Sequence, residues 1–473
     1  MDAFIQKELS SSFSFTKKKE YNIIKIYKGS VEMKYYCLGI KGTGMSTLAQ
    51  ILYDLGNEVS GYDDATGHKF TQVGLEERNI PIYYDQSKKL DKDTIVTYSV
   101  ALSEDHRELQ RVRKEGLRIV KYNEMVGSII KLFETVGVSG THGKTTTSSL
   151  IKHILEDNGG CNYFIGAGDG FATPDNKYLV VECDEFNHHF LAYHPKYSVI
   201  TNIEAEHLEC YKDIDEIRNA FETFANQTTD LVVANGDNNE VKKINYKTNV
   251  IFYGFNFNNT AVIKNLKLME DGSRFDIYIK EELYGSFEVP LFGKHMVSNV
   301  CAAILICKEL GIPKERIYES LKTFKNAKRR FAIETIRNTI IIDDYAHHPT
   351  EIKVTLEAAR QKYPNKRLVV VFKPNTYSRT RDFKDQFIEA LQVADKVFLT
   401  EIDCNREKPE DYPGVSSSMI TNEIEGAEII DEDHIEKLGE ELNSVVCFMS
   451  CAYVDKLIEN FKTYIINQPK VDE

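Results

Sequence analysis

The sequence predicts an α/β protein built from three units in series, and three observations support this class. Short apolar segments of about four to six residues alternate with longer segments whose apolar residues recur at helical spacing, as in NTIIIDD and the following PTEIKVTLEAARQKY. Two apolar segments run directly into glycine turns, GIKGTGM and GTHGKTTT, that open helices. The 473 residues suffice for about three domains. We therefore expect parallel sheets covered by helices on both faces.

The composition is that of an ordinary folded protein, and it argues against several partners. Hydrophobic residues make up 42% of the chain and charged residues 28%, unlike a disordered chain. The net charge of −13 opposes binding to nucleic acid. The nine cysteines are scattered without a C-x-x-C pair, which suits a reducing compartment. No apolar run reaches the ~18 to 20 residues that span a bilayer, so we expect no membrane association and a cytoplasmic location.

The first predicted unit follows residues 1–32, an extension that lacks a signal-peptide apolar core and to which we assign no function. From residue 35 the chain reads strand, glycine turn, helix and a second strand ending in Asp63, which indicates a βαβ nucleotide-binding unit. Gly42 and Gly44 would let the backbone approach a pyrophosphate, and Asp63 stands where such units place a ribose- or base-binding acid. A tight turn followed by a solvated aspartate is the plainer interpretation.

The most informative motif is GTHGKTTT, which follows the predicted strand ETVGVS and opens a helix. Its backbone N–H groups and the helix N-terminus would hold phosphates, Lys144 would reach the β- and γ-phosphates, and Thr145 would ligate Mg²⁺. The loop and the start of the helix comprise Gly140, Thr141, His142, Gly143, Lys144, Thr145 and Thr146. A plain strand-to-helix turn is the alternative, and the strand, loop and helix context favours phosphate binding.

Polar residues also follow later strands, at the edge where α/β proteins place their active sites. Glu182 ends the strand KYLVVE and could hold Mg²⁺ through oxygen, while His207 follows YSVITNI. A solvated side chain is the alternative for each. His295 and Asn299 lie four apart on one face of a predicted helix that ends at Gly311.

In their order along the chain these motifs resemble those of the Mur ligases. GIKGTGM, GTHGKTTT, TNI with a following histidine, KRRF, DDYAHHPTEI and FKPNTYSRT carry the resemblance, which extends from about residue 34 to 465. It implies a Rossmann-like UDP-sugar-binding domain over residues 33–125, a central P-loop ATP-binding domain over 126–327 and a C-terminal Rossmann-like ligase domain over 328–473. The implied reaction is an ATP-dependent amide ligation in peptidoglycan precursor synthesis. ATP would phosphorylate the lactyl carboxylate of UDP-N-acetylmuramate, and the amine of L-alanine would attack the acyl phosphate.

The resemblance also implies roles for single residues. ATP would be bound by the phosphate loop and four further residues, His295, Asn299, Arg330 and Asp344. The UDP-sugar would contact Gly42, Gly44, Met45, Ser46, Asp63 and His189. Thr145 and Glu182 would hold one Mg²⁺ and His207 a second, and the two ions would offset repulsion between two anionic substrates. The groups acting in the reaction would be Lys144, His207, Arg330, His347 and Arg379, the last gripping the alanine carboxylate. Because adjacent residues of a strand point to opposite sides, we choose His189 over His188.

The chain departs from the family pattern in the domain expected to receive the amino acid. Lys373 and Asn375 stand where a glutamine and a histidine are usual, and residues 449–456 replace a glycine-rich loop, which must therefore take another path. A nucleophile other than L-alanine, such as glycine or L-serine, stays open.

Other functions also stay open. One is a murein peptide ligase that attaches a preformed peptide, and another is a catalytically silent homologue that binds the UDP-sugar. A folylpolyglutamate-synthase-like ligase would lack the first βαβ unit, and an NAD-dependent dehydrogenase would not need a second phosphate loop. We expect a monomer or a dimer.

Overall fold

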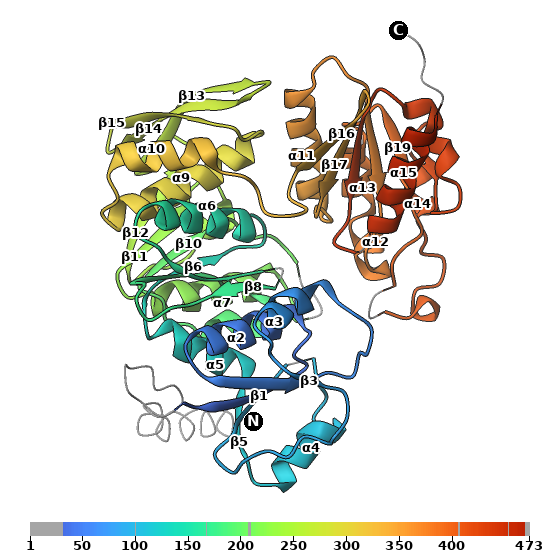
Figure 1. The fold of residues 1–473 in the computed structure, drawn as a ribbon. Helices are drawn as coiled ribbons and strands as arrows, with labels where there is room; N and C mark the ends of the chain where they lie inside the picture. The colour runs from blue at the N-terminus through green and yellow to red at the C-terminus, as the bar shows by residue number, and fades with distance from the viewer. Residues whose placement is uncertain are drawn as a thin grey trace. The chain divides into compact units, whose positions relative to one another are not determined.

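The chain forms three sheets in a computed structural model that describes residues 32–99, 101–166, 168–206, 210–404, 407–452 and 454–468. Two compact units result. The first comprises the described residues up to 262 together with 301–320, and the second comprises 263–300 together with those from 321 onward (Figure 1). The predicted extension lies outside the described residues, apart from its last residue.

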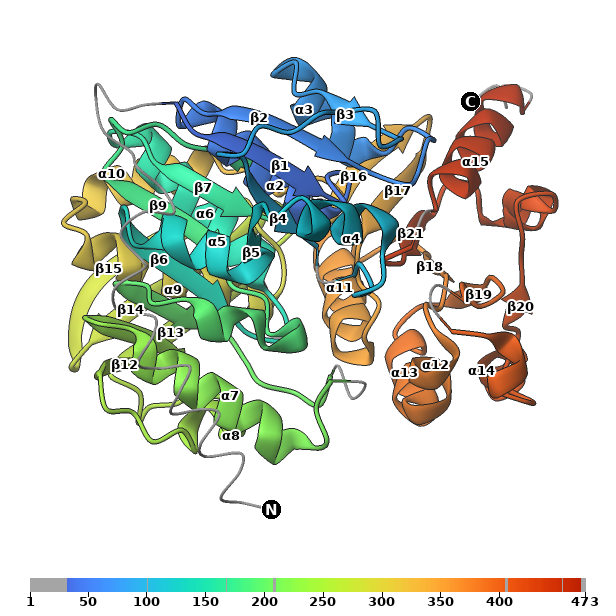
Figure 2. The same cartoon turned by 90° about the horizontal axis from the view of Figure 1, so that it is seen from below.

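The first sheet has the parallel strand order β3-β2-β1-β4-β5 (Figure 2). Its strands are β1 (Lys34–Leu38), β2 (Glu58–Tyr62), β3 (Ile82–Tyr83), β4 (Ile95–Tyr98) and β5 (Arg118–Lys121). Alternate side chains along each strand enter separate cores on the two faces. Helices α2 (Thr43–Asp54) and α5 (Tyr122–Ile130) cover one face, and α4 (Arg107–Lys114) covers the other. The predicted βαβ unit is confirmed.

The second sheet has the order β15-β14-β13-β12-β11-β10-β6-β9-β7-β8, and its neighbours from β12 to β7 run parallel. Its strands are β6 (Glu134–Ser139), β7 (Asn162–Ile165), β8 (Asp169–Phe171), β9 (Tyr178–Glu182), β10 (Tyr197–Ile200), β11 (Leu231–Asn235), β12 (Asn249–Gly254), β13 (Ala261–Met269), β14 (Gly272–Ile279) and β15 (Glu282–Val289). Its helices are α6 (Lys144–Asp157), α7 (Ile214–Gln227), α8 (Asn239–Lys242), α9 (Lys294–Glu309) and α10 (Lys314–Thr323). The helix predicted to end at Gly311 is confirmed as α9, and the antiparallel β14–β15 hairpin is an addition that the sequence patterns did not predict.

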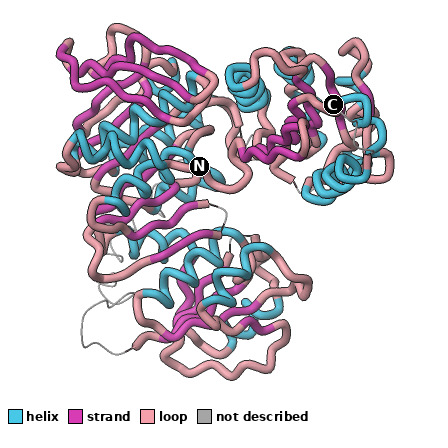
Figure 3. The backbone as a smooth tube through the Cα atoms, turned by 45° about the horizontal axis from the view of Figure 1, so that its top comes forward, coloured by secondary structure: helices cyan, strands magenta, loops and turns pink. Residues whose placement is uncertain are grey.

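The third sheet has the order β16-β17-β21-β18-β19-β20, with β16 antiparallel at its edge. Its strands are β16 (Ala332–Ile336), β17 (Thr339–Asp344), β18 (Leu368–Phe372), β19 (Lys396–Leu399), β20 (Glu428–Ile429) and β21 (Val445–Met449). One face packs against α11 (Pro349–Lys362), α13 (Lys384–Leu391) and α14 (Ser418–Thr421), and the other against α15 (Asp455–Asn467). The alternation of strands and helices is visible along the chain in Figure 3. The predicted parallel sheet with helices on both faces is confirmed.

The first two sheets are linked inside the first unit by helix α2. The Gln50 side-chain amide donates to the Gly168 carbonyl at 2.9 Å, and Arg78 donates to the Gly170 carbonyl at 3.1 Å. Helix α2 and the β8 edge of the second sheet therefore belong to one packed body. Among the described residues no helix combines the length and apolar character that a membrane span requires.

Candidate active site

The phosphate loop connects β6 to α6, and its shape depends on two glycines. Gly140 and Gly143 have φ of +141° and +82°, a region that other residues rarely adopt. A Cβ at Gly140 would lie 2.0 Å from the Thr201 hydroxyl oxygen. The segment after β10 braces the loop, because the Asn202 side-chain oxygen accepts from the His142 N–H at 2.9 Å and its amide donates to the His142 carbonyl at 3.0 Å. The TNI motif is thus a structural support of the GTHGKTTT motif.

A buried cation stands at the start of α6. Lys144 Nζ lies 2.9 Å from Glu185 Oε2 and donates to the Gly140 carbonyl at 2.6 Å, and the two paired side chains are only 13% and 3% exposed. Burial opposes the charge on Lys144, but the carboxylates of Glu185, Asp184 and Glu182 raise its pKa above the ordinary value. The ammonium group therefore stays charged at physiological pH. Glu185 was not predicted, although it follows Glu182 closely in the motif ECDE.

A hydroxyl and a carboxylate meet beside this cation. Thr145 Oγ1 donates to Glu182 Oε2 at 3.0 Å, and the Gly166 N–H donates to the same oxygen at 3.0 Å. Hard oxygen ligands of this kind suit Mg²⁺, so the two residues fit the ion that the family resemblance implies. The structure brings Thr145 and Glu182 together, whereas His207 lies outside the described residues.

The first glycine turn has a second buried lysine that the sequence patterns did not single out. Lys41 is 1% exposed, and its Nζ donates to the carbonyls of Ala65 and Gly67 at 2.5 and 2.6 Å. The Asp63 carboxylate accepts from the N–H groups of Lys41 and Ala65 at 2.9 and 3.0 Å. Asp63 therefore shapes the loop after β2. The position of Lys41 between two glycines was the signal in the sequence that could have identified this lysine. Met45 and Ser46 are buried in α2.

The strand proposed for His188 and His189 is wrong. Residues Phe186–Ala192 form a 3₁₀ segment in which Asn187 and His188 have φ of +52° and +59°. The chain turns there because Phe190 enters the core, where its ring lies 5.1 Å from that of Phe221. His189 is nevertheless the buried member of the histidine pair.

In the second unit, Arg330 is held between two strained neighbours. Arg329 and Phe331 have φ of +56° and +51°, positions that cost free energy for residues with side chains. The Arg329 guanidinium donates to the carbonyls of Ser450 and Ala452 at 2.7 and 3.0 Å, which ties the segment to the loop after β21. Arg329 was not among the predicted residues, although it stands in the KRRF motif.

Asp344, at the end of β17, supports the same segment. Its carboxylate accepts from the Phe331 N–H at 2.7 Å and from the Ala346 N–H at 2.8 Å. Burial raises the pKa of Asp344 to about 6, while Arg330 and the two N–H groups oppose this shift. The Arg330 guanidinium lies over the Tyr345 ring, 4.8 Å from its centroid.

Four other predicted residues also lie in the second unit. Burial lowers the pKa of His295 to about 4 against the opposing charge of Glu351, so its imidazole is neutral near pH 7. Asn299 is buried on α9. His347 Nδ1 lies 3.2 Å from Glu351 Oε2, and Arg379 belongs to the short helix α12 (Tyr377–Asp382).

The departures from the family pattern contact one another. The Asn375 amide donates to Cys451 Sγ at 2.9 Å, and the Ser450 hydroxyl donates to the Lys373 carbonyl at 2.9 Å. Among the described residues 450–452 and 454, none has a positive φ, as expected for a loop without glycine. The loop is fixed by side chains of its neighbours.

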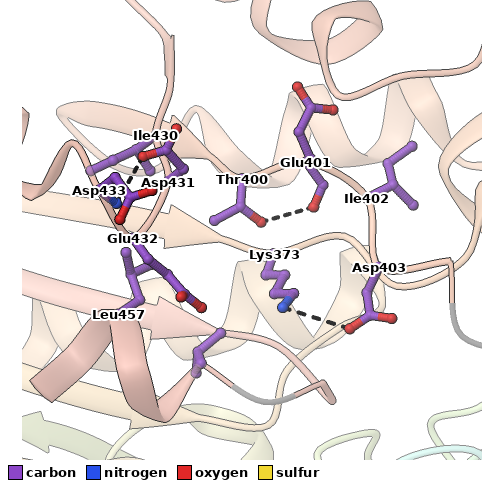
Figure 4. A pocket seen from close by; sticks show the side chains of 11 residues that line it. Lys373, Thr400, Glu401, Ile402, Asp403, Ile430, Asp431, Glu432, Asp433 and Leu457 are labelled. Carbon is purple, nitrogen blue, oxygen red and sulfur yellow. Dashed lines mark hydrogen bonds and ion pairs between the residues drawn. The ribbon is translucent and has the colours of Figure 1, made fainter. Parts of the chain in front are cut away.

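A pocket of about 390 Å³ opens at the carboxyl ends of β18, β19 and β20 (Figure 4). Lys373 lies 3.6 Å from Asp403 inside it. The lining also carries the acidic residues Glu401, Asp431, Glu432 and Asp433. None of the predicted catalytic, ATP-binding, UDP-sugar-binding or metal residues lines this pocket.

On the UDP-sugar contact that the family resemblance implies for Gly44, the Gly44→Ala substitution is expected to weaken UDP-sugar binding about tenfold, because a Cβ at Gly44 would lie 2.4 Å from the Tyr122 hydroxyl oxygen. The Tyr122 ring must then move from the start of α2. Gly67→Ala is a matched control, since a Cβ there meets no atom within 4 Å. Titration calorimetry with UDP-N-acetylmuramate measures both variants, and equal affinities would contradict the expectation.

Comparison with family models matches three consecutive segments of the chain. Residues 34–134 match the Mur ligase family, catalytic domain; residues 138–307 match the Mur ligase middle domain; and residues 329–447 match the Mur ligase, glutamate ligase domain. Together they cover the three sheets.

Curated relatives match nearly the whole chain. The UDP-N-acetylmuramate--L-alanine ligase of Lacticaseibacillus paracasei is 39% identical over 438 residues, which are 92% of this chain and 100% of the relative. The enzyme of the same name from Ligilactobacillus salivarius is 39% identical over 437 residues, 92% of this chain and 98% of the relative.

Solved structures agree with this relationship. The UDP-N-acetylmuramate-alanine ligase MurC from Thermotoga maritima has a TM-score of 0.76 at 26% identity, covering 92% of this chain and all of its own. A murein peptide ligase from Psychrobacter arcticus has a TM-score of 0.64 at 20% identity, covering 93% of this chain and all of its own, which shows a common fold. The chain belongs to the Mur ligase family.

Proposed function

We propose that the protein is an ATP-dependent amide ligase that joins L-alanine to UDP-N-acetylmuramate in peptidoglycan precursor synthesis. The observation that carries the proposal is the buried, charged Lys144 beside the Thr145–Glu182 pair, directly after the glycine loop. The 39% identity to curated ligases of this activity over 92% of the chain supports the same reaction.

The chemistry requires that an inert carboxylate become reactive. A lactyl carboxylate oxygen attacks the γ-phosphorus of ATP, and ADP leaves with the electrons of the broken P–O bond. The alanine amine then attacks the acyl carbon, and inorganic phosphate leaves as the nitrogen loses a proton. Because the transferred phosphoryl group is highly charged, alignment and charge stabilisation supply most of the rate.

We assign roles to the chain's own residues on this basis. The loop N–H groups and Lys144 bind the ATP phosphates, and Thr145 and Glu182 would hold Mg²⁺, which offsets repulsion between the two anionic substrates. Gly42 and Gly44 border the UDP pyrophosphate. Further proposed contacts are His295, Asn299, Arg330 and Asp344 for ATP, His347 and Arg379 for the amino acid, and His207 for a second ion. We also propose domain boundaries near residues 125 and 327, a cytoplasmic reaction because its substrates are ATP and a UDP-sugar, and a monomer or dimer.

A second candidate differs only in the nucleophile. The Asn375–Cys451 contact and the hydrogen bond from Ser450 to Lys373 lie where the proposed amino-acid domain departs from the family pattern. Glycine, L-serine or a murein peptide is the alternative to L-alanine.

Phosphate release tests the function directly. We expect ATP hydrolysis to require UDP-N-acetylmuramate and L-alanine together, and L-alanine to exceed glycine, L-serine and a murein peptide in kcat/KM. Phosphate release with ATP alone would refute the ligase. The absence of phosphate release with every pair of UDP-sugar and nucleophile would also refute it. A preference for another nucleophile would keep the ligase and replace L-alanine.

A further inference from the structure

A buried nitrogen without a partner lies in the 3₁₀ segment that follows β9 in the first unit. His189 is 9% exposed, and its Nε2 has no hydrogen-bond partner among the described residues. A buried polar atom left unpaired costs about 1 to 3 kcal/mol, so such an atom indicates a bound group that pairs with it. The left-handed Asn187 and His188 directly before it add strain, which is typical of positions retained for function.

The surroundings of His189 are aromatic. Its ring centroid lies 5.8 Å from that of Tyr122 and 6.4 Å from that of Phe186, and Tyr122 also lies 6.4 Å from Phe164. Burial lowers the pKa of His189 below its ordinary value, with Asp184 opposing the shift. The imidazole is therefore neutral, and its unpaired Nε2 is a polar atom among aromatic rings.

Tyr122 connects the aromatic rings around His189 to the start of α2 and to the second sheet. Its hydroxyl lies against the start of α2, close enough that a Cβ at Gly44 would be 2.4 Å away. On its other side the Tyr122 ring lies 6.4 Å from that of Phe164, whose strand β7 pairs with β9 at Val181, next to Glu182. With the proposed pyrophosphate at Gly44 and the lactyl carboxylate near the Mg²⁺ that Glu182 would hold, the sugar between them would lie beside Tyr122 and His189.

We propose that His189, with Tyr122 beside it, recognises the N-acetyl group of the UDP-sugar, its Nε2 bonding the amide and the aromatic rings receiving the methyl. An acetamido group combines one neutral polar amide with one apolar methyl, which matches an unpaired neutral nitrogen among aromatic rings. The lactyl carboxylate matches less well, since a neutral imidazole gives it no charge. The inference rests on the proposed UDP-sugar substrate. It assigns to His189 the preference for an acetamido group at the 2-position of the sugar.

Two probes isolate the acetyl group. UDP-N-acetylglucosamine and UDP-glucose both lack the lactyl group and differ at the 2-position of the sugar. Calorimetry should show wild type binding the first about tenfold more tightly, and His189→Leu should bring this ratio close to one. His189→Gln, which keeps a hydrogen-bonding amide, should restore part of the ratio, and Tyr122→Phe should leave the ring packing intact and reduce the ratio less.

His153→Leu is the matched control, because His153 is a half-buried histidine of the same unit whose Nε2 already bonds the Ser320 carbonyl at 2.9 Å. An unchanged ratio in His189→Leu, or a loss confined to UDP-N-acetylmuramate, would overturn the proposal. With the full substrate set, KM for the UDP-sugar should rise about five- to tenfold while KM for ATP stays constant. If wild type released no phosphate, the ligase function would be refuted instead. The ratio of the affinities for UDP-N-acetylglucosamine and UDP-glucose could still be measured, so the two failures are distinguishable.

Discussion

Replacing Lys144 with methionine is expected to lower kcat about 10²- to 10³-fold, since one preorganised charge at the transferred phosphoryl group is lost. The neighbouring carboxylates keep the lysine charged although it is buried, so the cation is in place before the reaction. Methionine retains the length and apolar stem of the side chain. Phosphate release at saturating UDP-N-acetylmuramate, L-alanine and ATP measures the effect.

The same substitution should also destabilise the first unit, and this effect must be separated from catalysis. Glu185 is 3% exposed, and without Lys144 it becomes an uncompensated buried charge, at a cost of about 3 to 5 kcal/mol. The double variant Lys144→Met/Glu185→Gln removes both charges and should recover most of the stability but none of the rate. Recovery of activity together with stability would show that Lys144 has only a structural role.

The local part of this architecture could be predicted from the sequence. Strand, glycine turn and helix follow one another within a few residues in both nucleotide loops, and apolar periodicity marks each element. The phosphate loop, Thr145 and Glu182 were selected for the same reason, because residue type and position after a strand indicate their chemistry.

What the sequence could not show depends on contacts between distant segments. Arg329 donates to carbonyls more than a hundred positions along the chain, and no spacing rule indicates such a pair. The turn at His189 follows from the burial of Phe190, which overrides strand alternation. The bonds of Asp344 to backbone N–H groups likewise appear only once the chain is folded.

The second large effect concerns pH, because Asp344 and His295 should oppose each other in the stability of the second unit. Between pH 4 and 6 folded Asp344 keeps a proton that the unfolded carboxyl has lost, so stability falls as pH rises, by about 3 kcal/mol. Folded His295, with its pKa lowered to about 4, lacks a proton that the unfolded imidazole binds up to about pH 6.5, so stability rises with pH over nearly the same range.

Each single substitution should therefore make the stability of the second unit depend on pH, whereas in wild type the two opposite dependences cancel. Asp344→Asn should leave stability rising from pH 4 to 6.5, and His295→Gln should leave it falling from pH 4 to 6, with Arg330 and Glu351 unchanged beside them. Hydrogen exchange of peptides from β17, corrected for the intrinsic pH dependence of exchange, reports on this unit within the full chain. The double variant is expected to be flat, like wild type. If the free energy of unfolding changed with pH in the same direction in both single variants, the prediction would be contradicted. The two groups cancel in wild type only when burial shifts their pKa values in opposite directions.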